Sequence, residues 1–204
     1  MRCGVLGTAT VGRTIAGKLT ELGHEVRVGS REAGEDKVVF ADAVAFGGAV
    51  VNATAGGASL DALAAAGADN LAGKLLLDVA NPLDFSLGMP PILSVCNTTS
   101  LGEQIQAAFP EAKVVKSLNT VNAAVMVDPA IVPGSHNIFM AGDDEGAKAQ
   151  VAELLQSFGW PAEDIMDLGD ISAARGMEMF LPLWLRLYMS RGTGHLNVNV
   201  VSGD

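Results

Sequence analysis

The segment Gly7-Thr8-Ala9-Thr10-Val11-Gly12-Arg13 follows the apolar run Cys3-Gly4-Val5-Leu6 and opens an amphipathic stretch. This pattern predicts a strand that turns sharply on small residues into a helix. Such a turn directs backbone N–H groups and the positive end of a helix dipole outward, which suits a pyrophosphate. The common pattern has a second glycine where this chain has Ala9, so a methyl group stands at the point of closest approach. We therefore expect a dinucleotide site at residues 7–12; a tight turn that binds no ligand is the alternative.

The end of the next expected strand, Glu25-Val26-Arg27-Val28-Gly29, is followed by Ser30 and Arg31. In dinucleotide-binding folds an Asp or Glu at this place holds a ribose 2′-hydroxyl, whereas an Arg accommodates a 2′-phosphate. A small residue, a hydroxyl and a guanidinium together suit a phosphate. We therefore expect NADP rather than NAD, although the carboxylate of Glu32 beside Arg31 favours the opposite choice.

Strand-like and helix-like segments alternate along most of the chain, which is typical of a parallel sheet covered on both faces. The expected strands are 2–6, 25–29, 37–40, 49–54, 75–79, 114–117 and 138–142. The expected helices are 11–22, 41–46, 59–66 and 144–158. A capping box at 100–103 predicts one more helix, which runs to residue 109. The predicted fold class is α/β, a Rossmann-type doubly wound, mostly parallel sheet with a short C-terminal helix-strand extension. Residues 1–168 would form the NADP-binding domain, and residues 169–204 would form a segment for substrate capping and dimerisation.

One connection does not fit this scheme. Only residues 32–36 separate the second strand from 37–40, yet a parallel crossover takes about a dozen residues. Either 37–40 is not a parallel neighbour, or a loop that would lie over the adenine has been lost.

The last third of the chain has a different pattern. Residues 172–189 predict one helix, apolar nearly all round and buried on most sides, with a kink at Pro182. Residues 194–201 alternate like a strand with one buried face. Such a helix and strand can cap a site, build a dimer, or both.

Composition restricts the partners. The 204 residues are 49% hydrophobic and 18% charged, with a net charge of −10, which indicates a packed globular protein and hints at an oligomer interface. This charge argues against nucleic acid and anionic membranes as partners. No targeting segment, membrane span or close-spaced metal motif is recognisable, so we expect a cytoplasmic protein without a metal.

Several segments match one family together: Gly7–Gly12, Leu22–Glu25, Gly29–Arg31, Asp78–Pro82, Val115–Thr120 and Ala141–Asp144. The C-terminal part matches in pattern, with an apolar helix after Ala174–Glu178 and a final Asn/Val segment. Over most of its length the chain thus resembles the F420-dependent NADP oxidoreductases, relatives of the NADPH-oxidising domain of STEAP-type metalloreductases. The resemblance implies a homodimer that moves hydride between NADPH and the deazaflavin F420.

The resemblance also implies a site. Ser30 and Arg31 would hold the 2′-phosphate, Thr8 and the loop Thr54-Ala55-Gly56 would line the cofactor, and Asn81-Pro82 would lie near the nicotinamide. F420 would stack beneath the segment 118–122, whose candidate contacts are Asn119, Thr120, Val121 and Asn122. Loops after parallel strands converge on one edge of a sheet, so Thr54, Asn81 and Asn119 can approach one cleft. Beside the C-terminal tail, His195 is the one histidine that we would test for substrate contact.

Other interpretations remain open at these positions. Asn81-Pro82 can simply end a strand, and Asn119 and Asn122 can cap loop backbone. Lys116 is expected to pair with a carboxylate, and His136 is expected in an exposed loop. The aromatic stripe 177–188 is read as core and interface, with cofactor contact from its edge as a secondary possibility.

Hydride transfer between two cofactors asks little of side chains, so no catalytic acid or base is predicted. Two rival functions stand beside F420 reduction. One keeps the NADPH site but uses a flavin, a quinone or a ferric acceptor. The other is an NADP-sensing protein without turnover.

Overall fold

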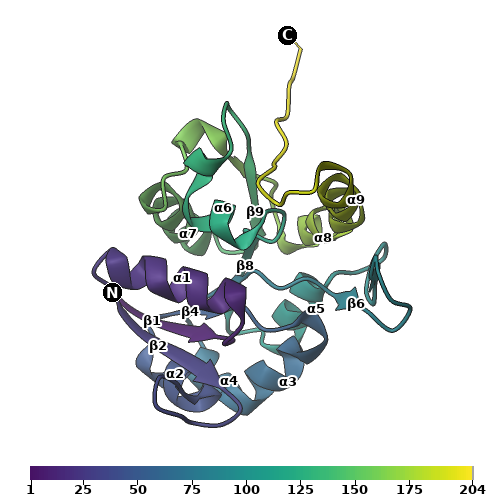
Figure 1. The fold of residues 1–204 in the computed structure, drawn as a ribbon. Helices are drawn as coiled ribbons and strands as arrows, with labels where there is room; N and C mark the ends of the chain where they lie inside the picture. Colours follow the sequence, from purple (N-terminus) through teal and green to yellow (C-terminus); the bar gives the residue numbers. More distant parts are fainter. Residues whose placement is uncertain (204) are drawn as a thin grey trace.

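The computed structural model describes residues 1–203. Its main sheet has the strand order β10-β9-β8-β5-β4-β1-β2-β3. Figure 1 shows the chain, with β1, β2, β4, β8 and β9 of this sheet labelled. The strands are β1 (Arg2–Leu6), β2 (Glu25–Ser30), β3 (Val38–Val39), β4 (Ala49–Asn52), β5 (Leu75–Asp78), β8 (Lys113–Ser117), β9 (Ile138–Gly142) and β10 (Ile165–Asp167). All adjacent pairs are parallel except β8 with β9, so β9 and β10 run opposite to the rest. The predicted doubly wound, mostly parallel fold is confirmed.

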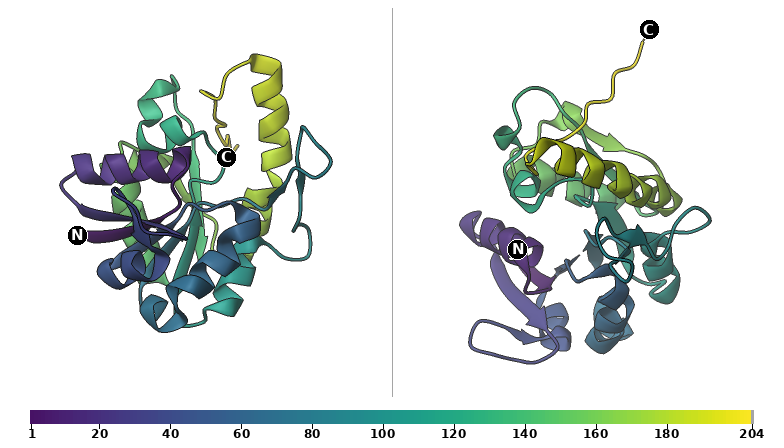
Figure 2. Two further views of the ribbon diagram at one scale, coloured as in Figure 1. Left: turned by 60° about the horizontal axis from the view of Figure 1, so that its bottom comes forward. Right: turned by 45° about the vertical axis from the view of Figure 1, so that its right-hand side comes forward.

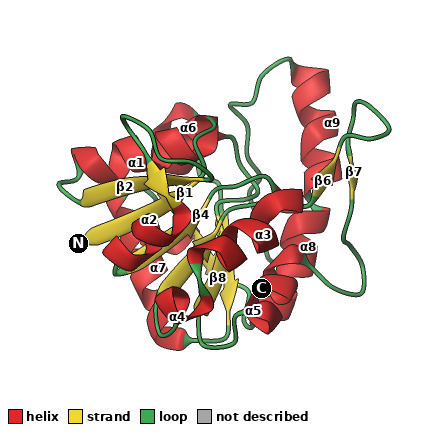
Figure 3. Cartoon of the chain, turned by 90° about the horizontal axis from the view of Figure 1, so that it is seen from below, coloured by secondary structure: helices red, strands yellow, loops and turns green. Residues whose placement is uncertain are grey.

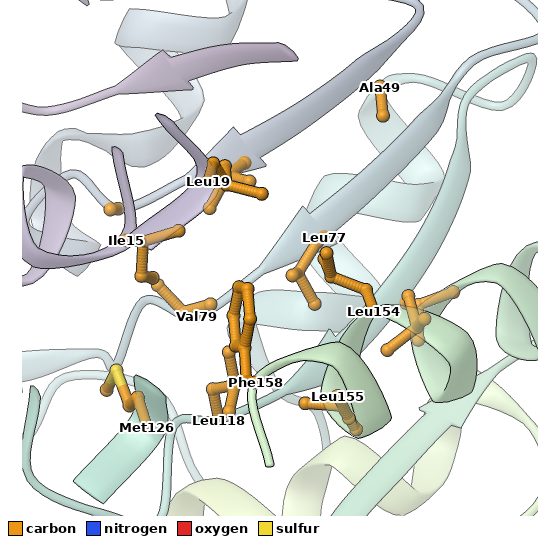
Figure 4. Close-up of a cluster of buried hydrophobic side chains, with 14 of the residues drawn as sticks. Ile15, Leu19, Ala49, Leu77, Val79, Leu118, Met126, Leu154, Leu155 and Phe158 are labelled. Atoms are coloured by element: carbon orange, nitrogen blue, oxygen red, sulfur yellow. The ribbon is translucent and has the colours of Figure 1, made fainter. Parts of the chain in front are cut away.

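Helices cover both faces of this sheet. One face carries α1 (Thr10–Glu21), α6 (Ala123–Val127) and α7 (Glu145–Ser157), and the other carries α2 (Phe40–Phe46), α3 (Gly56–Ala66), α4 (Ala68–Leu71) and α5 (Leu101–Ala108). Successive residues of a strand point to opposite faces, so Val51 and Leu77 enter one core while Val50 and Leu76 enter the other. Figure 4 shows the first core, where side chains of α1 and α7 meet those of the central strands.

The remaining elements are short or C-terminal. Short 3-10 turns are η1 (Pro129–Ile131), η2 (Ala162–Asp164) and η3 (Ile171–Ala173), and the last helices are α8 (Ala174–Met179) and α9 (Leu181–Arg191). An antiparallel pair, β6 (Leu83–Asp84) with β7 (Ile92–Leu93), stands outside the main sheet. No helix among residues 1–203 is both long enough and apolar enough to cross a membrane.

The strand order reverses direction between β1 and β4. After β1 the chain enters α1 on one face, and after β4 it enters α3 on the other. In open α/β sheets ligands bind outside the carboxyl ends of the strands at such a switch point. This is where the sequence placed residues 7–12 and Thr54.

The short connection after β2 is compatible with a parallel neighbour, so neither alternative offered for it is needed. β3 pairs in parallel with β2 over only two positions, Gly29 with Val38 and Ser30 with Val39. A two-residue strand lets the chain return over a short distance, so no crossover helix is required. Within the loop, the N–H of Gly34 donates to the carbonyl of Lys37 at 2.9 Å.

The helical segment expected over 172–189 is present and its predicted kink at Pro182 is confirmed, but the prediction of its burial is wrong. It begins as η3 and divides into α8 and α9 at Phe180, because Pro182 lies in the first turn of α9 and lacks the N–H that a continuous helix needs. It is not buried on most sides. Leu181 and Leu185 are buried, but the opposite side of α9 is exposed, with Leu183 56% accessible.

The tail at 194–201 is not the expected strand. Its polar residues are instead bonded to the loop before β9: the amide of Asn197 donates to the carbonyl of Asn137 at 2.8 Å, and the N–H of Val200 donates to Asn137 Oδ1 at 2.7 Å. One backbone bond, from the N–H of Asn137 to the carbonyl of Val198 at 2.9 Å, joins these side-chain bonds, and no regular ladder forms. His136, expected to be exposed, is buried here, and its Nδ1 lies 2.9 Å from Asn197 Nδ2.

Candidate functional site

The turn between β1 and α1 is closely packed. Gly7 has φ +119°, and a Cβ there would lie 2.4 Å from the carbonyl oxygen of Ala53. A Cβ on Gly12 would lie 2.1 Å from the carbonyl oxygen of Gly7. Both positions therefore require glycine. Ala9, in contrast, has an ordinary φ of −79° and is the N-cap of α1, so its methyl group causes no backbone strain.

No side chain caps the first turn of α1, and that turn holds no acidic residue. Its N–H groups and the positive end of its dipole are therefore left for a ligand. Gly7 before the helix and Gly12 in its first turn, neither with room for a Cβ, form with the uncapped N-terminus of α1 a cradle of the kind that holds a pyrophosphate.

A crevice of about 920 Å³ extends from this turn toward the ends of β2 and β3. It brings together several predicted residues, namely Gly7, Thr8, Ala9, Ser30, Arg31, Thr54 and Ala55. It also contains Lys37, which the sequence analysis missed. The only available signal was that Lys37 is the next basic residue after Arg31. The crevice thus contains two cations and a hydroxyl together with the glycine turn, and the carboxylate residues Glu32 and Asp61 also line it.

A second pocket of about 410 Å³ adjoins the first and shares its wall of Ala53, Thr54 and Ala55. It is lined by a second set of predicted residues: Thr10, Val11, Asn81, Asn119, Val121 and Asn122. The loops after β1, β4, β5 and β8 therefore converge on one edge of the sheet, as the parallel topology predicts. Asn122 also caps α6, since its Oδ1 accepts from the N–H of Ala124 at 2.9 Å.

Two asparagines join the ends of β5 and β8 beside this pocket. Asn81 Nδ2 donates to the carbonyl oxygen of Asn119 at 2.8 Å, and Asn119 Nδ2 donates to Asn81 Oδ1 at 3.0 Å. The chain reaches this geometry through Leu118, whose φ of +62° is unusual for a bulky residue. The remaining oxygen, Asn119 Oδ1, is buried and has no hydrogen-bond partner. A buried acceptor without a donor is costly, so this atom is suited to receive a ligand N–H.

The far wall of the second pocket comes from segments outside the expected site. Leu181 and Trp184 come from α9, and Leu83 and Phe85 come from β6 and the loop that follows. Trp184 stacks on Tyr188 with ring centroids 5.6 Å apart, and its buried Nε1 has no partner. The edge of the aromatic stripe thus lines the pocket. This position is compatible with the secondary possibility raised above, that the edge of the stripe contacts a cofactor.

The structure does not bring every expected residue to these pockets. Gly12 lies beneath the turn, and Pro82 lies beside the lining residue Asn81. Thr120 is buried but lines neither pocket, and His195 is exposed and also lines neither. Across residues 1–203 we find no cluster of three His, Cys, Asp or Glu side chains placed to hold a metal ion.

A buried ion triad lies behind the second pocket. Lys116 Nζ is 2.8 Å from Asp78 Oδ2 and 2.8 Å from Glu178 Oε1, and all three side chains are inaccessible. Burial lowers the pKa of Lys116, but the charges of Asp78 and Glu178 outweigh it and hold this pKa above its ordinary value. The expected pairing of Lys116 with a carboxylate is confirmed, and it involves two.

No family model matches the chain. The crystal structure of a candidate F420-dependent NADP reductase from Arthrobacter sp. FB24 is 52% identical, with a TM-score of 0.93 over 98% of this chain and 99% of that one. The metalloreductase STEAP3 of Rattus norvegicus is 28% identical over 196 residues, which are 90% of this chain but only 38% of that protein. A reductive aminase from Aspergillus terreus shares the fold at 18% identity, with a TM-score of 0.65 over 94% of this chain and 62% of that one.

The fold, the paired pockets and these likenesses define an oxidoreductase of the Rossmann class. Its relation to the Arthrobacter protein is close along nearly the whole of both chains. The chain belongs to the family of F420-dependent NADP reductases.

Proposed function

We propose that this protein transfers hydride between NADPH and the deazaflavin coenzyme F420. The observation that carries the proposal is the shared wall of Ala53, Thr54 and Ala55, on which a dinucleotide crevice and a second pocket meet. Two ligands that each occupy one pocket would have their reacting ends at this wall. The 52% identity to a candidate F420-dependent NADP reductase supports the choice of ligands.

The residues of the first crevice fit NADP. The glycine turn and the uncapped start of α1 would take the pyrophosphate, with Thr8 and Ala9 beside it. Ser30, Arg31 and Lys37 would take the 2′-phosphate. Thr54 and Ala55 would lie along the nicotinamide half, toward Asn81 and Pro82. This assignment gives the phosphate two cations, Arg31 and Lys37, against the one neighbouring carboxylate of Glu32, which also lines the crevice.

The second pocket suits a flat ring. Trp184 and Phe85 offer aromatic surface, while Asn119 Oδ1 and Trp184 Nε1 offer one acceptor and one donor. Nicotinamide and deazaflavin carry the hydride chemistry themselves, so the residues need only hold the two rings in contact and exclude water. Asn119, Val121 and Asn122 would contact the acceptor. Thr120 and His195 would contribute only if the chain moved.

We infer that residues 1–168 bind the dinucleotide and that residues 169–204 cap the second pocket and form a homodimer. Figures 2 and 3 show α9 beside the β6–β7 segment at one side of the molecule. Exposed apolar side chains occur on both, and we call them the C-terminal apolar patch: Phe85, Leu87, Met89, Leu183, Tyr188 and Met189. A large exposed apolar patch is typical of a protein interface. A second copy of the chain would cover it and shield the second pocket from water.

This dimer is tested by placing a charge in the patch. Leu183→Glu puts a carboxylate where the partner would pack, and burying an unpaired charge is strongly unfavourable. Light scattering after gel filtration should give a mass of two chains for the parent and one for the variant. Leu22→Glu, at the end of α1 and outside the patch, is the matched control and should stay dimeric. A single-chain mass for the parent protein would refute the dimer.

The reaction is tested with NADPH and F420. On mixing with purified protein, the visible absorbance of the deazaflavin should fall at a rate proportional to protein concentration. No change with F420, together with turnover of FMN or a ferric chelate, would assign a different acceptor. Binding of NADPH without turnover of any acceptor would identify a sensor. Either result would reject the proposed reaction.

A further inference from the structure

A continuous hydrogen-bond network connects the C-terminal helices to the wall between the two pockets. It starts at Glu178 of α8 and passes through Lys116 of β8 to Asp78 of β5, each contact being 2.8 Å. Asp78 Oδ1 then accepts from Asn52 Nδ2 at 2.8 Å. Asn52 Oδ1 in turn accepts from Thr54 Oγ1 at 2.7 Å. Thr54 lines both pockets, so the network ends at the shared wall.

Every charged group of this network is compensated by the protein. The carboxylate of Glu178 accepts the N–H groups of Leu101 and Gly102 at 2.8 and 3.1 Å, at the positive end of α5. Asp78 Oδ1 accepts the N–H of Ala80, and Lys116 Nζ also donates to the carbonyl of Ala80. A buried ion network is costly unless its groups are satisfied and well oriented. Its members therefore have one favourable arrangement, which fixes the neighbouring side chains.

The same pair of helices has a second ionic contact without this connection. Arg175 Nε of α8 donates to Glu103 Oε2 of α5 at 2.7 Å. This pair is partly exposed, and neither residue has a hydrogen bond to Asp78, Asn52 or Thr54. It holds α8 on α5 but does not reach the pockets. A variant at this ion pair can therefore distinguish an effect of docking α8 on α5 from an effect of positioning Thr54.

We propose that Glu178, Lys116 and Asp78 are positioning residues that couple the C-terminal helices to Thr54. α8 leads directly into α9, which supplies Leu181 and Trp184 to the far wall of the second pocket. The triad thus holds the far wall of the second pocket, formed by α9, in a fixed position relative to the shared wall that contains Thr54. The inference rests on the proposed function, which identifies the ligand of the first crevice as NADP. It deepens that function by giving the triad a role at the nicotinamide end of the site only.

Binding measurements test this without any turnover. Glu178→Gln places an amide nitrogen against groups that are all donors, so the arrangement of Lys116 and Asp78 must change. We expect the Kd of NADP⁺ to rise about 5- to 10-fold, as for the loss of one positioned hydrogen bond near 1 kcal/mol. Adenosine 2′,5′-bisphosphate reaches the Ser30–Arg31 end and the glycine turn but lacks the nicotinamide half, so its Kd should change less than about twofold. General loosening of the fold would instead weaken both ligands equally and would overturn the proposal.

A double-mutant cycle with Thr54→Val tests the coupling itself. Thr54 and Glu178 share no direct hydrogen bond, so independent sites would give Kd changes for NADP⁺ that multiply. If the network positions Thr54, the double variant should bind NADP⁺ about as weakly as Thr54→Val alone. Multiplying effects would refute the coupling.

Arg175→Gln is the control, because it removes the other ionic contact between α8 and α5. It should leave both Kd values within about twofold of the parent, since a partly exposed pair contributes little. A change as large as that of Glu178→Gln would show that docking of α8 alone explains the effect, and would also refute the proposal. Failure of hydride transfer to F420 would reject the proposed reaction but not these binding results, so the two outcomes are distinguishable.

Discussion

Arg31→Ala is expected to raise the Kd of NADPH about 10- to 100-fold while changing that of NADH less than about threefold. The guanidinium lies in the crevice beside Ser30, where only NADP carries a phosphate. Charge-assisted hydrogen bonds are worth about 1.5–3 kcal/mol, and each 1.4 kcal/mol is tenfold in affinity. Arg31 is exposed, so salt screens part of this energy. Titration calorimetry with both cofactors at one fixed ionic strength measures the difference.

Arg27→Ala is the control for this prediction. Arg27 lies within β2, four residues before Arg31, but its guanidinium lies 4.3 Å from the centre of the Phe46 ring and lines neither pocket. Its removal lowers the net positive charge by the same amount without touching the crevice. Equal weakening of NADPH and NADH by Arg31→Ala would show that the 2′-phosphate lies elsewhere. Lys37 stays in the crevice, so a residual preference for NADPH is expected.

Lys116→Met should cause the largest loss of stability, about 3–5 kcal/mol, because it leaves two buried carboxylates without their cation. In a chain of this size 1 kcal/mol corresponds to about 2–4 °C in Tm, so the Tm should fall by roughly 6–20 °C. Differential scanning calorimetry provides the measurement. Methionine keeps most of the lysine's volume, so the effect reports the charge rather than a cavity.

Two further variants test whether the unpaired buried charges cause this loss of stability. Arg175→Met removes the partly exposed pair with Glu103 and should cost at most about 1 kcal/mol. Combining Lys116→Met with Asp78→Asn and Glu178→Gln removes all three charges, so part of the lost stability should return. A Tm for Lys116→Met within one or two degrees of the parent would mean that the triad is not the buried centre described above.

The sequence allowed the sheet and its binding edge to be predicted because both depend on local patterns. Buried runs such as 49–51 and 75–77 are apolar on both faces, which is typical of a parallel strand covered on both sides. The capping box was also local, and Ser100 Oγ does accept from the N–H of Glu103 at 3.1 Å. The positions of Ser30 and Arg31 could be predicted because, in a dinucleotide-binding fold, the end of the second strand has a fixed position relative to the turn after the first strand.

What the sequence could not show depends on contacts between distant segments. Asp78 and Lys116 face each other only through the register of β5 with β8, and Glu178 approaches from a helix 62 residues after Lys116. Strand β10 and the reversed direction of β9 are likewise settled by tertiary packing. Trp184 reaches the second pocket from α9; the kink at Pro182 was predictable, but the pocket that the indole ring would reach was not. The tail is held on residue 137 by one backbone bond and by side-chain bonds of Asn137 and Asn197, contacts that its alternating pattern does not reveal.

The central claim is that hydride passes directly from NADPH to F420 across the wall formed by residues 53–55. Its most direct test uses NADPH carrying deuterium at the transferable position of nicotinamide C4, with mass spectrometry of the reduced deazaflavin. Direct transfer predicts that, with one of the two C4-deuterated epimers, nearly every reduced F420 molecule carries one deuterium, in ordinary water. Reduced F420 without deuterium from either epimer, or no reduced F420 at all, would contradict it.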